Sequence, residues 1–460
     1  MSQSNFFNEE PDYVSISDNA KGLDHIPSDM GKPIIGHTFS YVADPMQVLG
    51  DLYKNHGPVV KSSFTFQEVI VALGPEFIQQ VTLDSEKAFS TRMGYEPALK
   101  HFFEGGLLMR DFDAHKFHRR IMQTAFKNDA MRNYIGAMNP LIEKATDSWA
   151  NDSNFHFYPN IKTLLLDIGA KVFLGLDLAD GETDRLNKAF LAMGDGTLAI
   201  VRKDWPLPWL KYRRGMNGRR YLDQFFLDLV PQKRGQEGAD MATYFANETT
   251  EEGEHFPADT VSKHLIFLLL AAHDTTTSAL TMASYYLAAH PEWQEQLRTN
   301  NDIMQGSHLS YEELAQVPDI ENTFKEAERL HPSVPAFMRR TVKEVEMGGF
   351  LIPAHTPIQV SPTFVHRMPE WWGDNANGFD PGRFARNEHK KHSFQWAPFG
   401  GGAHKCIGLH FADMLFKCVM SNMLKKYRIK FAPGYQYPTA IQHFPFAKTK
   451  DNLPLILEKI

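Results

Sequence analysis

Apolar residues recur at helical spacing along most of the chain and follow a strand pattern in only two places. The segment from Val59 to Leu73, which contains KSSFTFQEVIVAL, alternates enough to predict a small strand pair. A second strand-like patch, rich in Pro, Gly and β-branched residues, runs from Val342 to Val360. We predict helices over 111–127, 162–175, 216–230, 259–289, 311–330 and 408–427. The strands are too few for a doubly wound sheet, so the pattern predicts a mainly α protein with a smaller β region.

The 460 residues show no internal repeat and no linker between independent halves. Hydrophobic residues make up 43% of the chain, enough to bury a sizeable core. We therefore expect a loose lead-in over 1–30 and a single domain over 31–460, with a β-rich subregion near 57–75 and 342–360.

Charge and hydropathy restrict the setting in which the protein works. The formal net charge of −7 argues against non-specific nucleic-acid binding. The stretch Met1–Lys21 is polar and acidic, unlike a signal peptide or membrane anchor. The most apolar stretch, Leu265–Ala272, is too short to span a bilayer. We expect a soluble, cytoplasmic protein without a transmembrane anchor.

The segment Trp205–Leu210 is an apolar loop, because two prolines forbid a continuous helix there. Two interpretations remain open. The segment is either a buried turn or an apolar lid over 205–210 that touches a membrane or a hydrophobic substrate, with Arg213 and Arg214 just behind it.

The segment Phe399–Gly408 contains three consecutive glycines and one of the two cysteines, Cys406. The glycines let the backbone approach a flat partner closely. His404, Lys405 and the start of the following helix favour the thiolate form of Cys406. One thiolate suffices for a haem iron but not for a zinc or iron–sulfur site. A buried, inert cysteine is the alternative, and the absence of a following Lys-Ser/Thr argues against a phosphate loop.

Three further motifs each have a functional and a plain interpretation. Glu326 and Arg329 share a helix face, but such pairs are usually solvated. Asp274 opens a run of hydroxyl residues that either kinks a long helix or follows an N-cap. His115 and Arg119, spaced i,i+4, could grip a carboxylate or form a solvated basic face.

The spacing Phe399-x-x-Gly402-x-x-x-Cys406-x-Gly408 resembles the haem-binding loop of the cytochrome P-450 family. The three motifs above follow the order and spacing of that family, so the resemblance covers nearly the whole chain. It implies a cytochrome P-450 fold with haem b (iron protoporphyrin IX) between the long central helix and the cysteine loop with its following helix. It also implies a haem-thiolate monooxygenase that inserts one oxygen atom from O2 into a substrate.

The resemblance assigns roles to individual residues. Cys406 would be the axial ligand of the haem iron, and Asp274 and Thr275 would deliver protons. Ala272 stands where the family commonly has Gly. The structural network would be Glu326, Arg329 and Arg383. The cofactor-binding residues would be His115, Arg119, Arg339 (with Arg340 as rival), Phe399, Gly402, His404, Cys406 and Gly408.

Glu328 departs from the apolar residue usual in the family's motif, and we interpret it as solvent-facing.

The substrate implied by the family layout is a hydrophobic small molecule of the steroid, terpenoid or fatty-acyl type. The pocket would be lined by Leu107, Leu108, Met109, Leu268, Ala271, Ala336, Phe337, Met338 and Phe444.

The chain carries no flavin, nicotinamide or iron–sulfur motif, so electrons must come from a separate protein. We expect a ferredoxin-type or flavoprotein donor on a basic face beside the cysteine. That face would consist of Lys116, Arg119, Arg120, Lys405, Lys417, Lys425 and Lys426.

Two rival functions remain at this stage. A peroxide-driven haem-thiolate enzyme would need no electron partner, but such enzymes generally lack the pair Asp274-Thr275. A haem-binding sensor or carrier would need no proton relay.

Overall fold

The structure is a computed structural model, and it describes residues 22–64, 67–176, 181–199, 202–203, 205, 207–250, 253–300 and 308–460. Its internal contacts divide the chain into two compact units. Among the described residues, unit 1 contains those of 91–141 and 163–273, and unit 2 contains those of 22–90, 142–162 and 274–460. The expectation of one domain over 31–460 stays a prediction. Of the expected lead-in, 1–21 lies outside the described residues, and Ser28–Asp29 forms strand β1.

The named elements of unit 1 are all helices. Its own elements are α4 Thr91–Phe103, η2 Leu107–Met109, α5 Phe112–Met122, η3 Gln123–Phe126, the π-helix η4 Gly169–Phe173, α8 Gly181–Thr197, α9 Lys211–Lys233 and α10 Met241–Asn247. Three helices have residues in both units: α6 Asn128–Trp149, α7 Phe157–Ile168 and α11 Ala258–Ala289.

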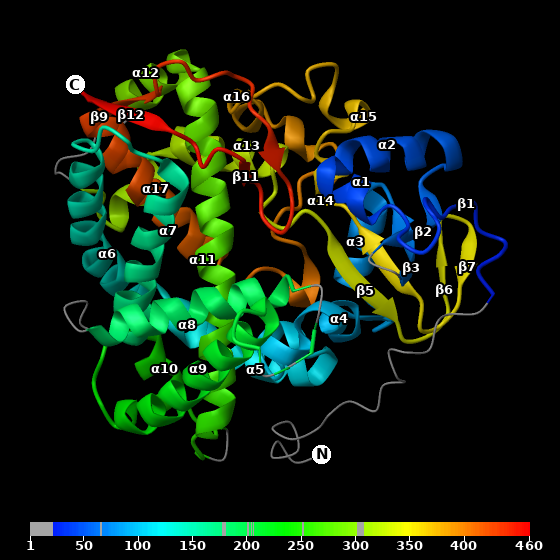
Figure 1. Ribbon diagram of the computed structural model, residues 1–460, viewed down its shortest axis with the longest axis horizontal. Helices are drawn as coiled ribbons and strands as arrows, with labels where there is room; N and C mark the ends of the chain where they lie inside the picture. The colour runs from blue at the N-terminus through cyan, green and yellow to red at the C-terminus, as the bar shows by residue number, and fades with distance from the viewer. Residues whose placement is uncertain are drawn as a thin grey trace. The chain divides into compact units, whose positions relative to one another are not determined.

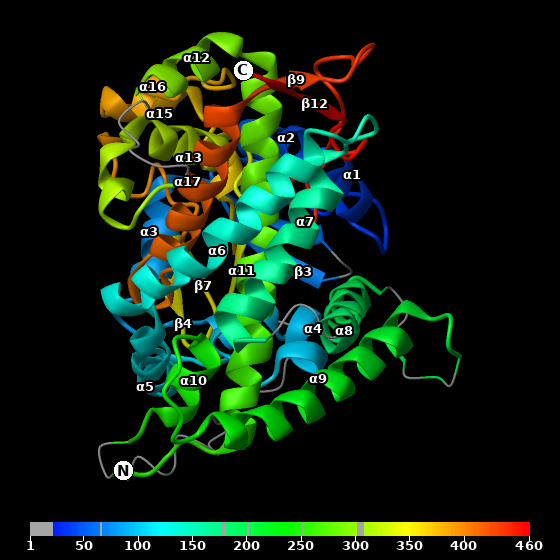
Figure 2. The same ribbon diagram turned by 90° about the vertical axis from the view of Figure 1, so that its left-hand side faces the viewer.

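Helices α8 and α9 lie side by side in both views (Figure 1, Figure 2). Glycines allow this close approach, since a Cβ placed on Gly215 would lie 2.8 Å from the Cα of Gly196. A side chain at either position would therefore push the two helices apart.

Unit 2 contains the strands and the remaining helices. The helices are α1 Thr38–Ala43, α2 Pro45–His56, α3 Pro75–Leu83, α12 Pro291–Asn300, η5 Glu312–Gln316, α13 Pro318–Leu330, α14 Pro362–Val365, α15 Pro369–Trp372, α16 Gly382–Ala385, η6 Glu388–Lys390, η7 Gly402–His404 and α17 Leu409–Lys426. The strands after β1 are β2 Val59–Phe64, β3 Gln67–Ala72, β4 Phe89–Ser90, β5 Phe337–Thr341, β6 Val345–Met347, β7 Phe350–Ile352, β8 Pro357–Val360, β9 Tyr427–Phe431, β10 Ile441–Gln442, β11 Lys448–Thr449 and β12 Leu455–Lys459.

The largest sheet of unit 2 has the strand order β1-β2-β3-β8-β5-β4. Strands β2 and β3 are antiparallel, with Val60 opposite Val71, which confirms the predicted strand pair. Strand β8 joins β3 in parallel and β5 antiparallel, so the two strand-like patches of the sequence meet in one sheet. In β3, Val69–Ala72 are all buried, because both faces of this central strand are covered.

Several predicted helices have different ends for local reasons. The predicted helix 311–330 divides into η5 and α13, because Pro318 occupies the first turn of α13 and cannot continue a preceding helix. The predicted helix 162–175 begins earlier, at Phe157, and changes into the π-helix η4 after Ile168. Helix α11 matches the prediction closely and continues through Asp274, so the alternative that Asp274 caps a new helix is wrong.

Among the described residues, α11 is the helix long and apolar enough to cross a membrane. However, 67% of its most apolar window is buried inside the structure. That burial fits the core helix of a soluble protein.

In the loop 205–210, Pro206 lies outside the described residues. The side chains of Trp205 and Trp209 are 49% and 69% exposed. The alternative of a buried turn is therefore wrong for these two tryptophans.

Candidate functional site

The loop that carries Cys406 precedes α17 in unit 2. Gly402 begins η7, and the Cys406 N–H donates to the carbonyl of Phe399 across 3.0 Å. The ring of Phe399 lies 5.8 Å from that of Phe324 on α13, which anchors the start of the loop. Gly408 is the N-cap of α17, so Cys406 stands immediately before a helix N-terminus, where a negative charge is stabilised.

Two glycines of this loop adopt backbone conformations that other residues rarely adopt. Gly400 and Gly402 have φ values of 66° and 59°, in the left-handed region. A Cβ at Gly402 would overlap the carbonyl oxygen of Thr82 in α3. The loop is therefore pressed against α3 in a conformation that only glycine permits at this place.

The two cysteines lie in opposite surroundings. Cys406 is exposed, whereas Cys418 is buried in α17 and 3% exposed. Burial raises the pKa of the Cys418 thiol, which keeps it protonated and inert. An accessible sulfur in a glycine-rich loop is a suitable single ligand for a haem iron. The donor set thus fits the cofactor that the sequence implies.

Asp274 and Thr275 lie in the middle of α11. The Asp274 carboxylate forms an ion pair with Lys162 of α7, with Nζ and Oδ1 3.0 Å apart. The Asp274 and Lys162 side chains are 13% and 25% exposed. Sequence reasoning missed Lys162, because 112 positions separate two residues that nothing in the pattern links.

The backbone carbonyl of Thr275 has a partner outside α11 that the sequence did not suggest. The Ser333 hydroxyl lies 2.8 Å from the Thr275 carbonyl oxygen and 2.6 Å from Oε1 of Glu328. Glu328 is 2% exposed, so the interpretation of this residue as solvent-facing is wrong. The turn after α13 folds back and covers its carboxyl group with Ser333.

Glu326 and Arg329 form a fully buried ion pair, not a solvated one. Arg329 donates through Nε and Nη2 to the two oxygens of Glu326, at 2.7 and 2.8 Å. Its other donors reach the carbonyl oxygens of His366, Ala376 and Gly378. All five N–H groups of the guanidinium are therefore satisfied, as burial of a charge requires.

Arg383 of α16 lies beside this pair. Its Nε lies 3.4 Å from Oε1 of Glu326, and the Asp380 N–H donates to the same oxygen across 2.8 Å. Burial raises the pKa of Glu326, while Arg329 and Asp380 counter that rise. The cluster connects α13 to the segment that leads towards the cysteine loop.

Arg339 and Arg340 occupy neighbouring positions of β5, so they point to opposite faces of the sheet. Arg340 is 1% exposed and donates through Nε to the carbonyl of His355 across 2.7 Å. Arg339 donates to the carbonyl of Met338. Residue His404 lies half-buried in η7, on the same loop as Cys406.

In unit 1, His115 and Arg119 lie on one face of α5. His115 is buried and Arg119 half-buried. The next histidine of the helix, His118, contacts His264 of α11 across 2.8 Å, and both rings are buried. Burial lowers the pKa of His264, so its ring is neutral.

The predicted pocket residues divide between the two units. In unit 1, Leu107, Met109 and Leu268 are buried, and Leu108 and Ala271 are half-buried. In unit 2, Phe337 is buried, Ala336 and Met338 are half-buried, and Phe444 is 46% exposed.

The predicted basic face needs a correction at two positions. Lys417 has a 4% exposed side chain, held by Glu321 at 2.9 Å and Asp413 at 2.7 Å. Lys426 is paired with Glu143 and Asp147. Their charges are neutralised within unit 2, because i,i+4 and tertiary carboxylates surround them. Lys116, Arg120, Lys405 and Lys425 are exposed, and Arg119 is half-exposed.

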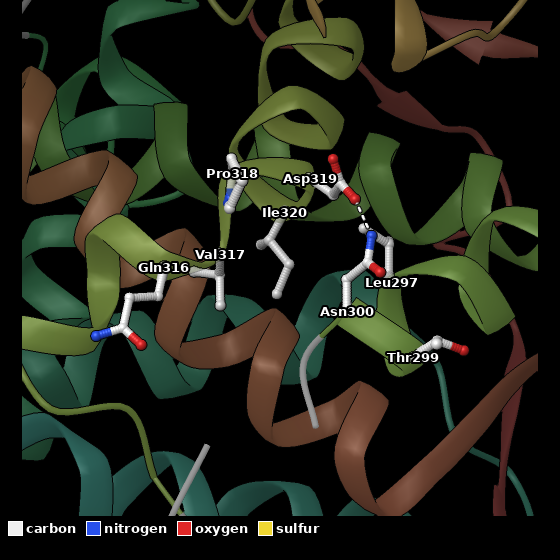
Figure 3. Close-up of a pocket in the computed structure, with 8 residues that line it drawn as sticks. All are labelled: Leu297, Thr299, Asn300, Gln316, Val317, Pro318, Asp319 and Ile320. Atoms are coloured by element: carbon white, nitrogen blue, oxygen red, sulfur yellow. Dashed lines mark hydrogen bonds between the residues drawn. The ribbon is translucent and has the colours of Figure 1, made fainter. Parts of the chain in front are cut away.

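A surface cavity of about 370 Å³ lies between α12, η5 and the start of α13. Figure 3 shows the side chains that line it. Asn300 donates to Asp319 at its edge. Its lining is Leu297, Thr299, Asn300, Gln316, Val317, Pro318, Asp319 and Ile320. None of the predicted site residues lines this cavity, so it is not the candidate site.

Comparison with known proteins places the chain among relatives over nearly its full length. Residues 27–455 match the family model described as Cytochrome P450. Cytochrome P450 136 of Mycobacterium tuberculosis is 36% identical over 95% of this chain and 89% of its own length. A sterol 14alpha-demethylase of Mycolicibacterium vanbaalenii is 24% identical over 86% and 89%.

A solved structure, cyanobacterial CYP120A1 with bound retinoic acid, matches with a TM-score of 0.82 at 21% identity, covering 95% of this chain and 99% of that one. The predicted fold is thereby confirmed.

Proposed function

This chain belongs to the cytochrome P450 family of haem-containing monooxygenases, and we propose that it oxidises a hydrophobic small molecule of the steroid, terpenoid or fatty-acyl type. One observation supports the assignment of the residue that would bind the haem iron. The only exposed thiol among the described residues, Cys406, stands in a glycine loop at the start of α17.

Haem, when bound, would supply the activation of O2, and Cys406 would hold its iron as a thiolate ligand that donates electron density. The other proposed contacts are to the propionates. His115 and Arg119 of α5 would bind one group, and Arg339 and His404 would bind the other, as charge-assisted hydrogen bonds. Phe399, Gly402 and Gly408 would shape the loop around the ligand.

Asp274 and Thr275 are the residues that we propose for proton delivery. A carboxylate and a hydroxyl on adjacent positions of α11 can hold water and pass protons by small movements. At rest, the half-buried Asp274 carboxylate is held in the ion pair with Lys162. For Asp274 to take part, its carboxylate has to leave Lys162 for a water molecule during turnover.

Replacing Thr275 by alanine should uncouple the enzyme. The variant should consume electrons and O2 at a rate near that of the wild type and yield mainly peroxide, with product per O2 reduced several-fold, because removal of the hydroxyl removes a proton donor. The measurement is the ratio of product to O2 consumed. Thr276→Ala is the matched control, since it removes the next hydroxyl of the same helix, and its ratio should stay near the wild-type value. An unchanged ratio in Thr275→Ala would remove the relay.

The substrate class follows from the apolar character of the predicted pocket residues. These side chains offer no fixed ionic anchor, which suits a substrate bound mainly by desolvation. Three relatives are named for hydrophobic compounds: a sterol, pentalenene and cyclooctat-9-en-7-ol. The retinoic acid bound to CYP120A1 is also hydrophobic.

Titration of the purified protein with a lipophilic library tests the substrate class. We expect steroids, terpenoids or fatty acyl compounds to displace iron-bound water and shift the haem absorption at micromolar concentrations. Hydrophilic metabolites of equal size are the control set. A shift produced by the hydrophilic set alone would contradict the proposal.

The family implies a redox partner, and we propose a ferredoxin-type or flavoprotein donor in a cytoplasmic setting. With Lys417 and Lys426 neutralised internally, the docking residues would be Lys116, Arg120, Lys405 and Lys425. The exposed tryptophans of 205–210 suit a transient membrane contact.

A further inference from the structure

Glu328 is a buried carboxyl group without a cationic partner among the described residues. It is 2% exposed, and its contacts are the hydroxyl of Ser333 at 2.6 Å and the N–H of Ser333 at 3.1 Å. Burial raises the pKa of Glu328 to about 7, and the two hydrogen bonds from Ser333 only limit the rise. Glu326, two residues earlier, differs because Arg329 neutralises it.

The single hydroxyl hydrogen of Ser333 links this arrangement to the protonation state of Glu328. Its Oγ lies within hydrogen-bond distance of two acceptors, Oε1 of Glu328 and the carbonyl oxygen of Thr275. A hydroxyl group carries a single hydrogen and can donate to one of them. Both contacts are hydrogen bonds at the same time only when Glu328 is protonated and itself donates to Ser333.

We propose that Glu328 and Ser333 are positioning residues for Thr275, connected by the chain Glu328 O–H to Ser333 O–H to Thr275 C=O. When Glu328 loses its proton to solvent, the Ser333 hydrogen turns to the carboxylate and the Thr275 carbonyl loses this donor. The extra bond holds the oxygen-activating segment of α11 in one geometry, so its loss loosens the placement of the Thr275 hydroxyl. This inference rests on the proposed role of Thr275.

The titratable neighbours from the packed elements are buried histidines and charged side chains that have partners of their own. His331 bonds the hydroxyl of Tyr286, and burial lowers its pKa well below the usual value. Burial also lowers the pKa of His366 to about 3, and its Nε2 accepts from the Ala397 N–H as a neutral ring does. The charged neighbours are paired or donate to carbonyl groups: Glu326, Arg329, Arg367, Arg383 and the pair Asp274–Lys162.

In the simpler alternative, Glu328 is an ionised acceptor whose only role is to bind Ser333 in the turn after α13. It predicts that the carboxylate is charged at all working pH values. Glu328→Gln separates the two accounts, because the amide N–H can donate to Ser333 at every pH and reproduces the protonated acid.

The first experiment measures product per O2 consumed against pH. Near pH 6 roughly nine-tenths of Glu328 is protonated and near pH 8 roughly one-tenth. Wild-type coupling should therefore fall at least about two-fold across this range. Glu328→Gln should stay near the low-pH value, and Ser333→Ala should be low at both ends. A wild-type ratio that does not depend on pH, or that falls equally in Glu328→Gln, would overturn the proposal.

The second experiment uses no turnover. The folded-state pKa lies above the ordinary value of 4.5, so the stability that the protonated form contributes is complete below about pH 4.5 and lost as pH rises through about 7. The unfolding free energy of the wild type should therefore decline relative to Glu328→Gln over that window. The infrared carbonyl band of the protonated Glu328 carboxyl group should disappear as pH rises through about 7.

A difference that is constant with pH would overturn the inference even if Thr275→Ala uncouples the enzyme. Conversely, a clear titration of Glu328 together with full coupling in Thr275→Ala would leave the buried acid in place and reject the proton relay. A titration of stability without any change in wild-type coupling would reject the positioning role.

Discussion

Replacing Arg329 by methionine should lower the free energy of unfolding by ~3–5 kcal/mol. The change leaves the Glu326 carboxylate buried with only Arg383, at 3.4 Å, as a cation nearby. It also removes the donors of three carbonyl groups, two buried and one partly buried, on the segments around α14 and α16. A charge that has lost its partner in a site with 0% exposure cannot recover its hydration.

Denaturant unfolding measures this loss, provided that the dependence of the unfolding free energy on denaturant concentration is the same in both proteins. Arg132→Met is the control. Arg132 pairs with Asp129 on α6 with the same i,i+3 spacing, but the side chains are 50% and 95% exposed. The control should change the free energy by less than about 0.5 kcal/mol. Equal losses in the two variants would show that burial does not determine the strength of the Glu326–Arg329 pair.

Replacing Cys406 by alanine should reduce product formation to background, because no other described thiol can donate to the iron. Cys418 lies buried in α17 with a raised pKa and belongs to a different environment. Product formation with a matched electron donor and substrate is the measurement, and haem content is determined in parallel. Cys418→Ala is the control and should retain turnover, with a modest loss of stability from the lost core packing. Substantial turnover in Cys406→Ala would refute the assignment.

The sequence predicted best those elements in which the local pattern and the tertiary environment agree. The strands around Val69–Ala72 and the helix α11 have apolar runs that are buried in the fold. The division of 311–330 was missed because periodicity continues across Pro318 while the backbone cannot. The predicted helix 216–230 lies within α9, but the close packing of α8 on α9 depends on glycine contacts between segments, which no local pattern reports.

The errors among the predicted site residues lie where burial, which spacing does not report, determines the environment of a side chain. Spacing placed Glu326 beside Arg329 but could not tell a surface pair from one with 0% exposure. The same limitation led to Glu328 being placed in solvent and Lys417 on a docking face, although both are buried. Lys162 and Ser333 were missed because their partners, Asp274 and Thr275, are distant in sequence and meet them only in the fold.

The spectrum of the reduced protein with carbon monoxide tests the central claim most directly. If Cys406 ligates the haem iron as a thiolate, the wild type and Cys418→Ala should show the strongly red-shifted Soret band of thiolate-bound haem. Cys406→Ala should lack that band while still binding some haem. A red-shifted band that persists in Cys406→Ala, or a wild-type band at the position typical of imidazole-ligated haem, would contradict the account.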